Sequence, residues 1–358
     1  MALMKAISFK GKGGHGVVTQ YKCPNCGSDM AFDAESGKLS CPNCGRQDDI
    51  ETFPEENILQ EFDTEEAKEY HCENCGAVIL TEANTTATHC SFCGAPVVLA
   101  ERLSGEFAPA KVIPFTISKD EAVAAFKKWT RNGRLTPRGF MSGDRIKKMA
   151  GMYVPFWLYD IDGTAEVAAI GTRVRSYTRG DTIYTETDFY DVYRGIDLSY
   201  LKVPADASEK MDDELMDKLE PYDYSELKDF KMPYLAGYLA EKYDYDDEAL
   251  FSRVESKIVP YIDSYIQSTI TGYSTVSYTN KQIQANKSKV YYTLFPVWMV
   301  YYDFENKEHT FAMNGQTGKV VGKPPISSGK VAAWFAGIAV SGFVVLKGIS
   351  YAMGGVLW

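Results

Sequence analysis

Alternating apolar and polar positions predict β-structure in the middle of the chain. Residues 167–177 and 183–203 carry threonine, tyrosine and valine on alternating faces, as strands with one buried face do. Before them, residues 153–159 are apolar and aromatic and end just before Asp162-Gly163. This dipeptide is typical of a tight hairpin turn. The pattern therefore predicts a hairpin that turns at Asp162-Gly163 and a second β-rich segment after it.

A further β-rich region covers residues 289–303. It contains Pro296-Val297-Trp298-Met299, which repeats the Pro-x-Trp-aliphatic pattern of Pro155-Phe156-Trp157-Leu158. Proline cannot donate a ladder hydrogen bond, so we expect two related strands, each with its proline at an edge or a bulge. Residues 311–321 predict a final hairpin, with Asn314-Gly315 supplying the turn.

Two segments combine helical periodicity with start or stop signals. Ser118 followed by Glu121 is a capping box, and it predicts a helix that continues to about Arg131. A longer helix is expected over 247–270, with a kink at Pro260. Its apolar residues recur at roughly helical spacing: Leu250, Phe251, Val254, Ile258 and Ile262.

The stretch between the two β-rich regions is strongly acidic. Residues 206–250 hold 15 Asp and Glu against 5 Lys, a net charge of −10. The whole chain has 38 Lys and Arg against 48 Asp and Glu, which is also −10, so the rest of the protein is balanced. We expect this block to be helical, since Asp206 with Glu209 matches a second capping box and Pro221 would close that helix.

The C-terminal residues change character and become almost uniformly apolar. Residues 331–358 hold a single charge, Lys347, and the first sixteen of them carry none. A helix of this length would extend about 40 Å, enough to cross a bilayer. Lys323 and Lys330 stand just before it, which predicts a cytoplasmic N-terminal part. We therefore expect a transmembrane anchor over 331–356; the alternative is an apolar helix packed on the soluble domain or between subunits.

All eight cysteines lie in four C-x-x-C-G knuckles near the N-terminus. Within each pair of knuckles, 14 residues separate the inner cysteines, and the first pair recurs 49 positions later. Residues from about 21 to 99 are therefore a tandem duplication. The cysteines are Cys23, Cys26, Cys41, Cys44, Cys72, Cys75, Cys90 and Cys93.

Two knuckles joined by a short β-hairpin supply four thiolates, the ligand set of a closed structural zinc site. The spacing therefore predicts two structural Zn²⁺ ions, one in a ribbon over 21–50 and one in a ribbon over 70–100. Disulfides or a redox C-x-x-C are the alternatives, but no cysteine is left over and no thioredoxin-like βαβ pattern surrounds the knuckles. His71 and His89 each precede a cysteine, and we expect them to be neighbours of the sites and not ligands.

Basic residues concentrate between 127 and 148, where only Asp144 opposes them. An anionic partner, either lipid headgroups or nucleic acid, is one interpretation. The favoured interpretation is a solvated helix face or an intramolecular mate for the acidic segments. A net charge of −10, to which each four-thiolate zinc site adds two negative charges, argues against nucleic acid. The basic residues are Lys127, Lys128, Arg131, Arg134, Arg138, Arg145, Lys147 and Lys148.

These features together resemble a known family. The two ribbons, the Pro-x-Trp strands and residues 311–319 (Phe-Ala-Met-Asn-Gly-Gln-Thr-Gly-Lys) before a terminal apolar segment resemble the TFIIB-type zinc-ribbon membrane proteins of Gram-positive bacteria. The resemblance covers nearly the whole chain. Some relatives are encoded beside SPFH (flotillin-like) and phage-shock-type proteins, so the resemblance implies partners of those kinds and a membrane-stress or membrane-organising assembly.

The expected fold class is α+β. Tandem four-cysteine zinc ribbons precede a mixed antiparallel-sheet and helix domain, and a C-terminal transmembrane helix follows. The expected divisions are a flexible leader at 1–20, ribbons at 21–50 and 70–100, the α+β domain at 110–325 and the anchor at 331–356.

We expect the protein to be a scaffold or adaptor that crosses the cell membrane once. Its N-terminal part is expected to face the cytoplasm and to recruit protein partners. The sequence is compatible with a monomer or an oligomer. A zinc-ribbon protein that binds nucleic acid through residues 127–148 is the alternative. No enzymatic activity is expected, because His309, the only histidine outside the leader and ribbons, stands beside no recognisable nucleophile.

Overall fold

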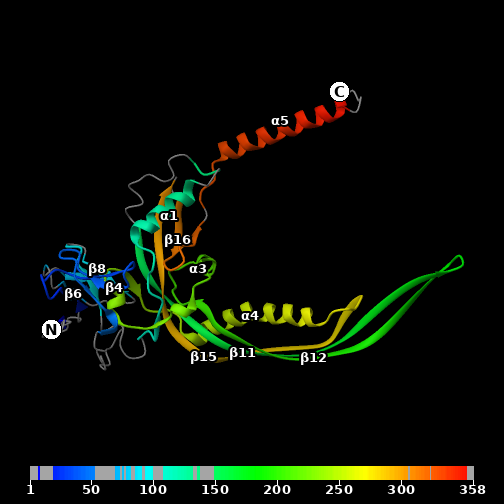
Figure 1. Cartoon of the computed structure of the whole chain (residues 1–358), viewed down its shortest axis with the longest axis horizontal. Helices are drawn as coiled ribbons and strands as arrows, with labels where there is room; N and C mark the ends of the chain where they lie inside the picture. Colours follow the sequence, from blue (N-terminus) through cyan, green and yellow to red (C-terminus); the bar gives the residue numbers. More distant parts are fainter. Residues whose placement is uncertain are drawn as a thin grey trace.

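A computed structural model covers the chain. The residues it describes are 7–8, 19–52, 69–72, 75, 78–81, 85–90, 93–99, 108–131, 135–137, 149–304, 307–322 and 324–352. They form a cysteine-rich end, a long twisted sheet with helices against it, and a C-terminal helix that extends away from the rest (Figure 1). This is the mixed α+β architecture that the sequence predicts.

The two cysteine-rich modules are built differently. The first is a separate antiparallel sheet of β3 (Ala31–Asp33), β4 (Lys38–Ser40) and β5 (Gln47–Asp48), followed by the short helix η1 (Ile50–Thr52). In the second, β6 (Glu69–His71) pairs with β7 (Val78–Leu80), whereas β8 (Thr85–His89) and β9 (Pro96–Val98) belong to the large sheet. Two strands from the expected leader, β1 (Ile7–Ser8) and β2 (Thr19–Gln20), continue that sheet beyond β9.

The centre of the large sheet is a long antiparallel pair. It consists of β11 (Ala150–Arg179) and β15 (Thr275–Phe304), and β12 (Thr182–Asp206) lies on the other side of β11. The chain turns between β11 and β12 at Gly180-Asp181, where Gly180 has a φ of +64°. The predicted turn at Asp162-Gly163 is wrong, because both residues are paired within β11, with Ser199 and Leu198 of β12. A Cβ on Gly163 would come within 2.9 Å of Ile262 Cδ1, so the glycine permits close helix packing and makes no turn.

Each Pro-x-Trp proline lies where its strand changes neighbours. On one side of β11, the short strand β14 (Leu239–Glu241) pairs up to Tyr153, and β12 begins its pairing at Phe156. Pro155 falls in the gap between them. Pro296 of β15 falls in a similar gap, between the pairings with β10 (Lys111–Val112) and β16 (Lys307–Asn314). Because no neighbouring strand pairs on that side at such a position, a proline there does not remove a ladder hydrogen bond.

Helix α4 (Asp247–Thr269) covers one face of β11, β12 and β15, and it confirms the predicted helix over 247–270. Its first turn is capped by Asp246, whose side chain accepts from the Ala249 N–H at 2.8 Å. The apolar side of the helix packs on Ile161, Val167 and Val192 of the strands. The buried helix residues are Leu250, Val254, Ile258, Ile262 and Ile266, with Phe251 partly buried beside them.

The acidic block is mostly not helical, contrary to the prediction. Before α4 begins at Asp247, its α-helix is α3 (Asp213–Leu219), which is accompanied by η4 (Tyr224–Glu226), β13 (Lys228–Asp229), η5 (Met232–Leu235) and β14. The capping box at Asp206 is wrong, since Asp206 ends β12 and its side chain accepts from the Ser208 N–H. The helix starts instead at Asp212, whose side chain accepts from the Leu215 N–H at 2.7 Å. It ends at Leu219, before Pro221 as expected.

The capping box at Ser118 is confirmed, and the final hairpin forms, but with a longer turn than the predicted one. Helix α1 (Lys119–Arg131) follows Ser118, whose N–H donates to Glu121 Oε2 at 2.9 Å. In the hairpin of β16 and β17 (Val320–Gly322), Asn314 and Gly315 do not form a two-residue turn. Asn314 Oδ1 instead accepts from the N–H groups of Gln316 and Thr317, and its Nδ2 donates to the Leu219 carbonyl at 3.1 Å. The asparagine therefore ties the loop to the end of α3.

Much of the basic segment lies outside the described residues. Lys127 and Lys128 are on α1, and Arg131 is its last residue. Arg134, Arg138, Arg145, Lys147 and Lys148 fall in stretches that the structure does not describe.

Candidate metal centres

The eight cysteines converge into two groups of four, in the arrangement that their spacing predicts. Within each group the four Sγ atoms all lie within 4.8 Å of one another. The groups, called tetrad 1 and tetrad 2 below, are Cys23, Cys26, Cys41 and Cys44, and Cys72, Cys75, Cys90 and Cys93.

The sulfur separations fit a tetrahedral metal site. In tetrad 1, Cys23 and Cys44 are 3.5 Å apart, as are Cys26 and Cys41. The matching pairs of tetrad 2 are separated by 3.6 and 3.7 Å. Four sulfurs about 2.3 Å from a central Zn²⁺ would lie about 3.8 Å apart, whereas a disulfide requires about 2.05 Å. The tetrads therefore fit two structural zinc ions, and since each group is complete with cysteines alone, neither needs a histidine ligand.

The knuckle backbone explains how adjacent cysteines point to one centre. The N–H of Gly27 donates to the Cys23 carbonyl at 2.8 Å and closes a tight turn around the first pair. Gly27, Gly45 and Gly94 have φ angles of +73°, +73° and +74°, a left-handed conformation that side chains disfavour. The glycine in C-x-x-C-G is thus required by the turn that places the two thiolates together.

Hydrogen bonds within the first ribbon favour thiolates at two of its ligands. The backbone N–H of Arg46 lowers the pKa of Cys44 to about 6, and the backbone N–H of Ser28 lowers the pKa of Cys26. Burial has the opposite effect on Cys23 and raises the pKa of its thiol to about 11. Four neighbouring thiolates need a compensating cation, and a bound Zn²⁺ supplies that charge and keeps the thiols deprotonated.

The two modules are tied together by β2, a segment that the sequence analysis assigns to the flexible leader. Thr19 of β2 pairs with Val98 of β9 in the second module, and β2 then leads directly into the first. The adjacent Gln20 is buried, and its Nε2 donates to Cys72 Sγ at 3.8 Å. An isolated glutamine before a knuckle carries no recognisable motif, so only the fold identifies this contact.

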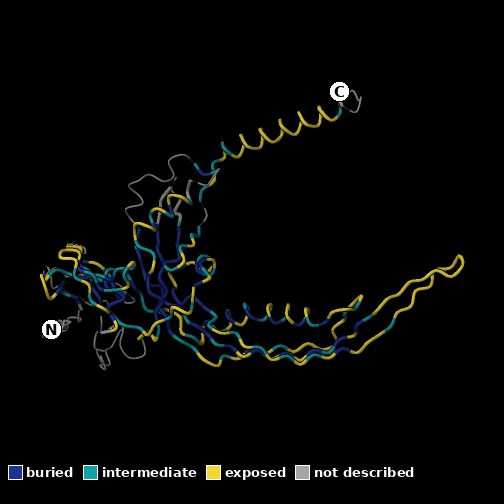
Figure 2. Tube along the Cα trace, viewed as in Figure 1, coloured by how far each residue is buried: buried dark blue, intermediate teal, exposed yellow. Residues whose placement is uncertain are grey.

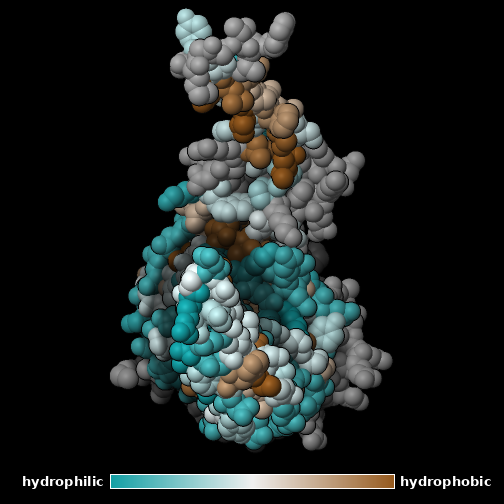
Figure 3. Space-filling model, turned by 90° about the vertical axis from the view of Figure 1, so that its right-hand side faces the viewer, coloured by the Kyte–Doolittle hydropathy of each residue, from teal (hydrophilic) through white to brown (hydrophobic). Residues whose placement is uncertain are grey.

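The C-terminal helix is the second feature with functional meaning. Within α5 (Ser328–Ala352), residues Ser328–Tyr351 form a stretch of 24 residues that is long and apolar enough to cross a membrane, and its most apolar 18 residues have a mean hydropathy of 1.7. None of its most apolar 18-residue stretch is buried (Figure 2). In space-filling view its apolar side chains stand clear of a largely hydrophilic body (Figure 3).

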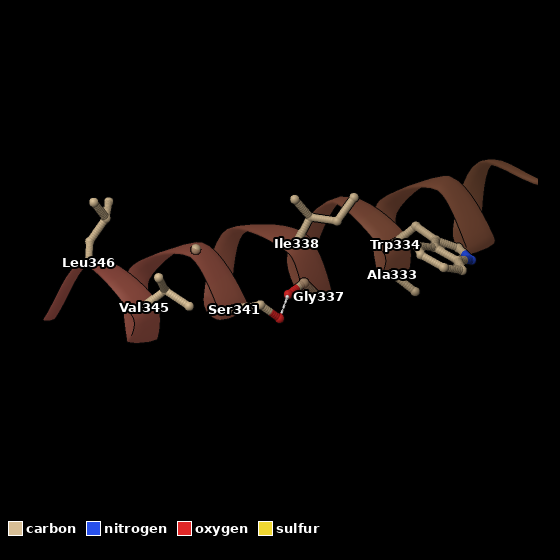
Figure 4. Close-up of a pocket in the computed structure, with 8 residues that line it drawn as sticks. Ala333, Trp334, Gly337, Ile338, Ser341, Val345 and Leu346 are labelled. Atoms are coloured by element: carbon tan, nitrogen blue, oxygen red, sulfur yellow. Dashed lines mark hydrogen bonds between the residues drawn. The ribbon is translucent and has the colours of Figure 1, made fainter. Parts of the chain in front are cut away.

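Three polar side chains of α5 have partners within the chain. The Ser341 hydroxyl donates to the Gly337 carbonyl at 2.7 Å, one turn earlier (Figure 4). The Lys347 ammonium lies 5.7 Å from the centre of the Phe343 ring. At the start of the helix, Lys330 Nζ donates to the Thr136 carbonyl at 2.6 Å, which connects α5 to the body.

Comparison with known proteins places the chain in a family. The TFIIB zinc-binding family model matches residues 21–62, which contain tetrad 1. No solved structure matches. A protein of Bacillus subtilis (strain 168), "Uncharacterized protein YdjG", is 63% identical over 339 residues, covering 95% of this chain and 99% of the relative. Neither name refers to a membrane or to an SPFH protein. The chain carries a TFIIB-type zinc ribbon and belongs to the same family as YdjG of Bacillus subtilis.

Proposed function

We propose that this protein is a non-enzymatic, membrane-anchored scaffold or adaptor whose zinc ribbons and sheet face the cytoplasm and recruit protein partners. The observation that carries the proposal is the exposure of the apolar side chains of α5, none of which is buried against the rest of the described chain. In this proposal the cysteines serve only as ligands of structural zinc, so the tetrads stabilise the fold of the two ribbons and catalyse no reaction.

The energetics of α5 favour a bilayer over water. Phe335 is 76% exposed and Ile338 65%, within an apolar surface larger than soluble monomers normally leave uncovered. Each such side chain gains about 1.5–3 kcal/mol on leaving water. Lys347 costs about 2.5–3.5 kcal/mol at the centre of a bilayer, and less where it reaches the interface near the helix end. The apolar side chains outweigh that single charge.

The polar features of the helix are also compatible with a membrane interior. The Ser341 hydroxyl is satisfied inside the helix, which removes the cost of an unpaired donor in lipid. Lys330 at the start of the helix marks the side with positive charge, and the positive-inside rule assigns the body to the cytoplasm. As partners we propose SPFH-type or phage-shock-type proteins, in a membrane-stress assembly, because the family resemblance implies them.

Membrane retention of the full-length protein tests the anchor. It should stay with membranes through alkaline carbonate washing, and a chain ending at Ser328 should be soluble, keep both zinc ions and melt cooperatively. Replacing Ile338 and Val345 by arginine should release the full-length protein, whereas Ser341→Ala should not. A full-length chain that is soluble without detergent, together with an unfolded shortened chain, would make α5 a core or oligomer helix and overturn the proposal.

A binding measurement separates the scaffold from a nucleic-acid-binding protein. At physiological salt we expect DNA binding no tighter than ordinary non-specific contact, about 10⁻⁴–10⁻⁶ M. A sequence-dependent nanomolar complex, weakened by replacing Arg131 and Arg134, would favour the nucleic-acid function instead.

A further inference from the structure

The hairpin of β11 and β12 continues far beyond the elements that support it. The last β15 residue paired with β11 is Thr275, opposite Thr172, and α4 ends at Thr269. Residues 173–179 of β11 and 182–188 of β12 therefore form a two-stranded arm with no third strand and no covering helix in the described chain (Figures 1 and 2). An isolated two-stranded ribbon is at best marginally stable in water.

One face of this arm satisfies its own polar groups. On the side that continues the α4-covered face, Arg175 lies 3.2 Å from Asp188, and the Tyr177 and Tyr184 rings stack at 5.5 Å. Arg173 lies over the Tyr190 ring at 5.0 Å. Arg175 and the two tyrosines are thus paired within the arm itself, whereas Arg173 also donates to the Gly272 carbonyl beside it.

The opposite face carries no charge. Its cross-strand pairs alternate with those of the first face, and hydroxyl, β-branched and aromatic side chains fill it. Ile183 and Phe189 are both 72% exposed. Towards the body the uncharged face ends at Ile170, because its cross-strand partner Asp191 is the first charged residue on this side. This uncharged face consists of the arm residues Val174, Ser176, Thr178, Ile183, Thr185 and Thr187, together with the pair of Thr172 and Phe189 at the base of the arm.

We propose that the uncharged face is a self-association surface, on which the same face of a second copy of this chain packs. Two such faces can be buried against each other without desolvating a charge and without like-charge repulsion. A contact that uses one patch from both subunits is the isologous arrangement of two-fold dimers. Stacked β-faces interdigitate their side chains at about 10 Å, and threonine, valine and isoleucine suit that spacing.

The available surface is sufficient for such a contact. Two copies together contribute six large exposed apolar side chains, three from each: Val174, Ile183 and Phe189. With the intervening threonines they offer on the order of 1,000 Å² for burial, which reaches the lower limit of specific interfaces. A partner that binds through charged groups would find no charged residue on this face. A second copy of the same uncharged face requires no charged residue for binding. The proposal does not depend on whether α5 crosses a membrane.

The mass of the full-length protein in detergent micelles tests the proposal. We expect a dimer by light scattering or native mass spectrometry, and Phe189→Asp should weaken it roughly a hundredfold or more, because both copies would bury an unpaired carboxylate. Tyr184→Asp on the opposite face of the same strand is the matched control and should leave the dimer intact. Both variants should keep their zinc, because neither side chain belongs to the buried core.

Changing the salt concentration gives an independent check. Since the face holds no charge, the dissociation constant should change little between about 0.1 and 1 M salt. A monomeric wild-type protein, or a dimer that Phe189→Asp leaves unchanged, would overturn the proposal. So would a dimer lost equally in both arm variants. A dimer that resists Phe189→Asp but is lost in Gly337→Leu would place the contact in α5, and a foreign protein bound to a monomeric chain through Phe189 would make the occupant another protein.

Discussion

The two zinc ribbons share one ligand geometry but are attached to the body by different interactions. Ribbon 1 keeps its own sheet and docks mainly by side chains, with the Phe32 ring 5.4 Å from Tyr234 and 6.2 Å from Tyr238. Ribbon 2 contributes backbone. Its strand β8 pairs with β14, and β14 pairs with β11 at the centre of the large sheet.

This difference shows what the duplication has preserved and what it has not. All four ligands recur 49 positions later, but the residue 49 positions after Phe32 is Thr81, so the docking ring has no counterpart in ribbon 2. Metal binding constrains the sequence of the knuckles. The sequence of each docking surface is constrained only by the part of the body that it contacts. We therefore expect loss of the second zinc to affect the large sheet more than loss of the first.

Removing both zinc ions should have the largest effect. Elemental analysis of protein purified without added metal should give two zinc ions per chain. A strong chelator should then disorder both ribbons, because structural zinc sites contribute on the order of 10 kcal/mol each. Helix α4 packs on the long strands and should keep its amide protection. A zinc content near zero, with the thiols paired as disulfides, would contradict the two-site interpretation.

Removing one zinc at a time tests the asymmetry directly. Cys41→Ser and Cys90→Ser should each leave one zinc per chain, because the tetrads share no ligand. Cys90→Ser should lower amide protection in β14 by roughly tenfold or more, since the unfolding of β8 exposes it. Cys41→Ser should leave β14 protected. Equal loss of protection in both variants would show that the ribbons unfold together.

The cysteine ligands could be predicted because their chemistry is local. A knuckle specifies its own turn, and four thiolates admit few alternatives to zinc. The docking of each ribbon could not be predicted, because Phe32 meets Tyr234 across about 200 residues and no spacing rule connects them. The backbone pairing of β8 with β14 likewise joins residues about 150 positions apart in sequence.

The hairpin shows how a correct local signal can mislead. Asp162-Gly163 has the composition of a turn, but the glycine is there because Ile262 of α4 approaches it closely. The true turn lies at Gly180-Asp181, where Gly180 has a positive φ angle. The turn-like composition of Asp162-Gly163 led the prediction to the wrong position. Helices α4 and α5 were predicted well because long runs of periodic or uniform apolar residues outweigh local ambiguity.

Removing the docking ring of ribbon 1 should have an intermediate effect. Phe32 is 5% exposed, and Phe32→Ala should cost about 3–5 kcal/mol of stability in the contact with η5. Both zinc ions should remain, because the ring is not a ligand. Hydrogen exchange of β3, whose Phe32 N–H donates to the Ala236 carbonyl at 2.8 Å, reports the undocking. Phe32→Leu is the matched control and should lose less; loss of zinc in Phe32→Ala would show that docking and metal binding are one unit.

The smallest effect is expected at the ion pair beside that ring. Glu51 of η1 lies 2.9 Å from the Lys231 ammonium, and the Tyr234 hydroxyl donates to its other oxygen at 3.3 Å. The hydrogen bond from Lys231 lowers the pKa of Glu51, so the folded state favours the carboxylate. The stabilisation is therefore present above the ordinary pKa of a glutamate and is lost as the pH falls through the lowered value.

Because the Glu51 side chain is 62% exposed, solvent screens this pair, and Glu51→Gln should cost at most about 1 kcal/mol at neutral pH. Thermal melts of Glu51→Gln and wild type should differ at low salt and converge at about 1 M salt. Lys218→Gln, which removes the surface pair with Glu214 on α3, is the control and should leave ribbon 1 unchanged. If Glu51→Gln instead matched Phe32→Ala in size and ignored salt, the pair would be a principal part of the docking contact, and ribbon 1 would depend on charge as much as on its aromatic ring.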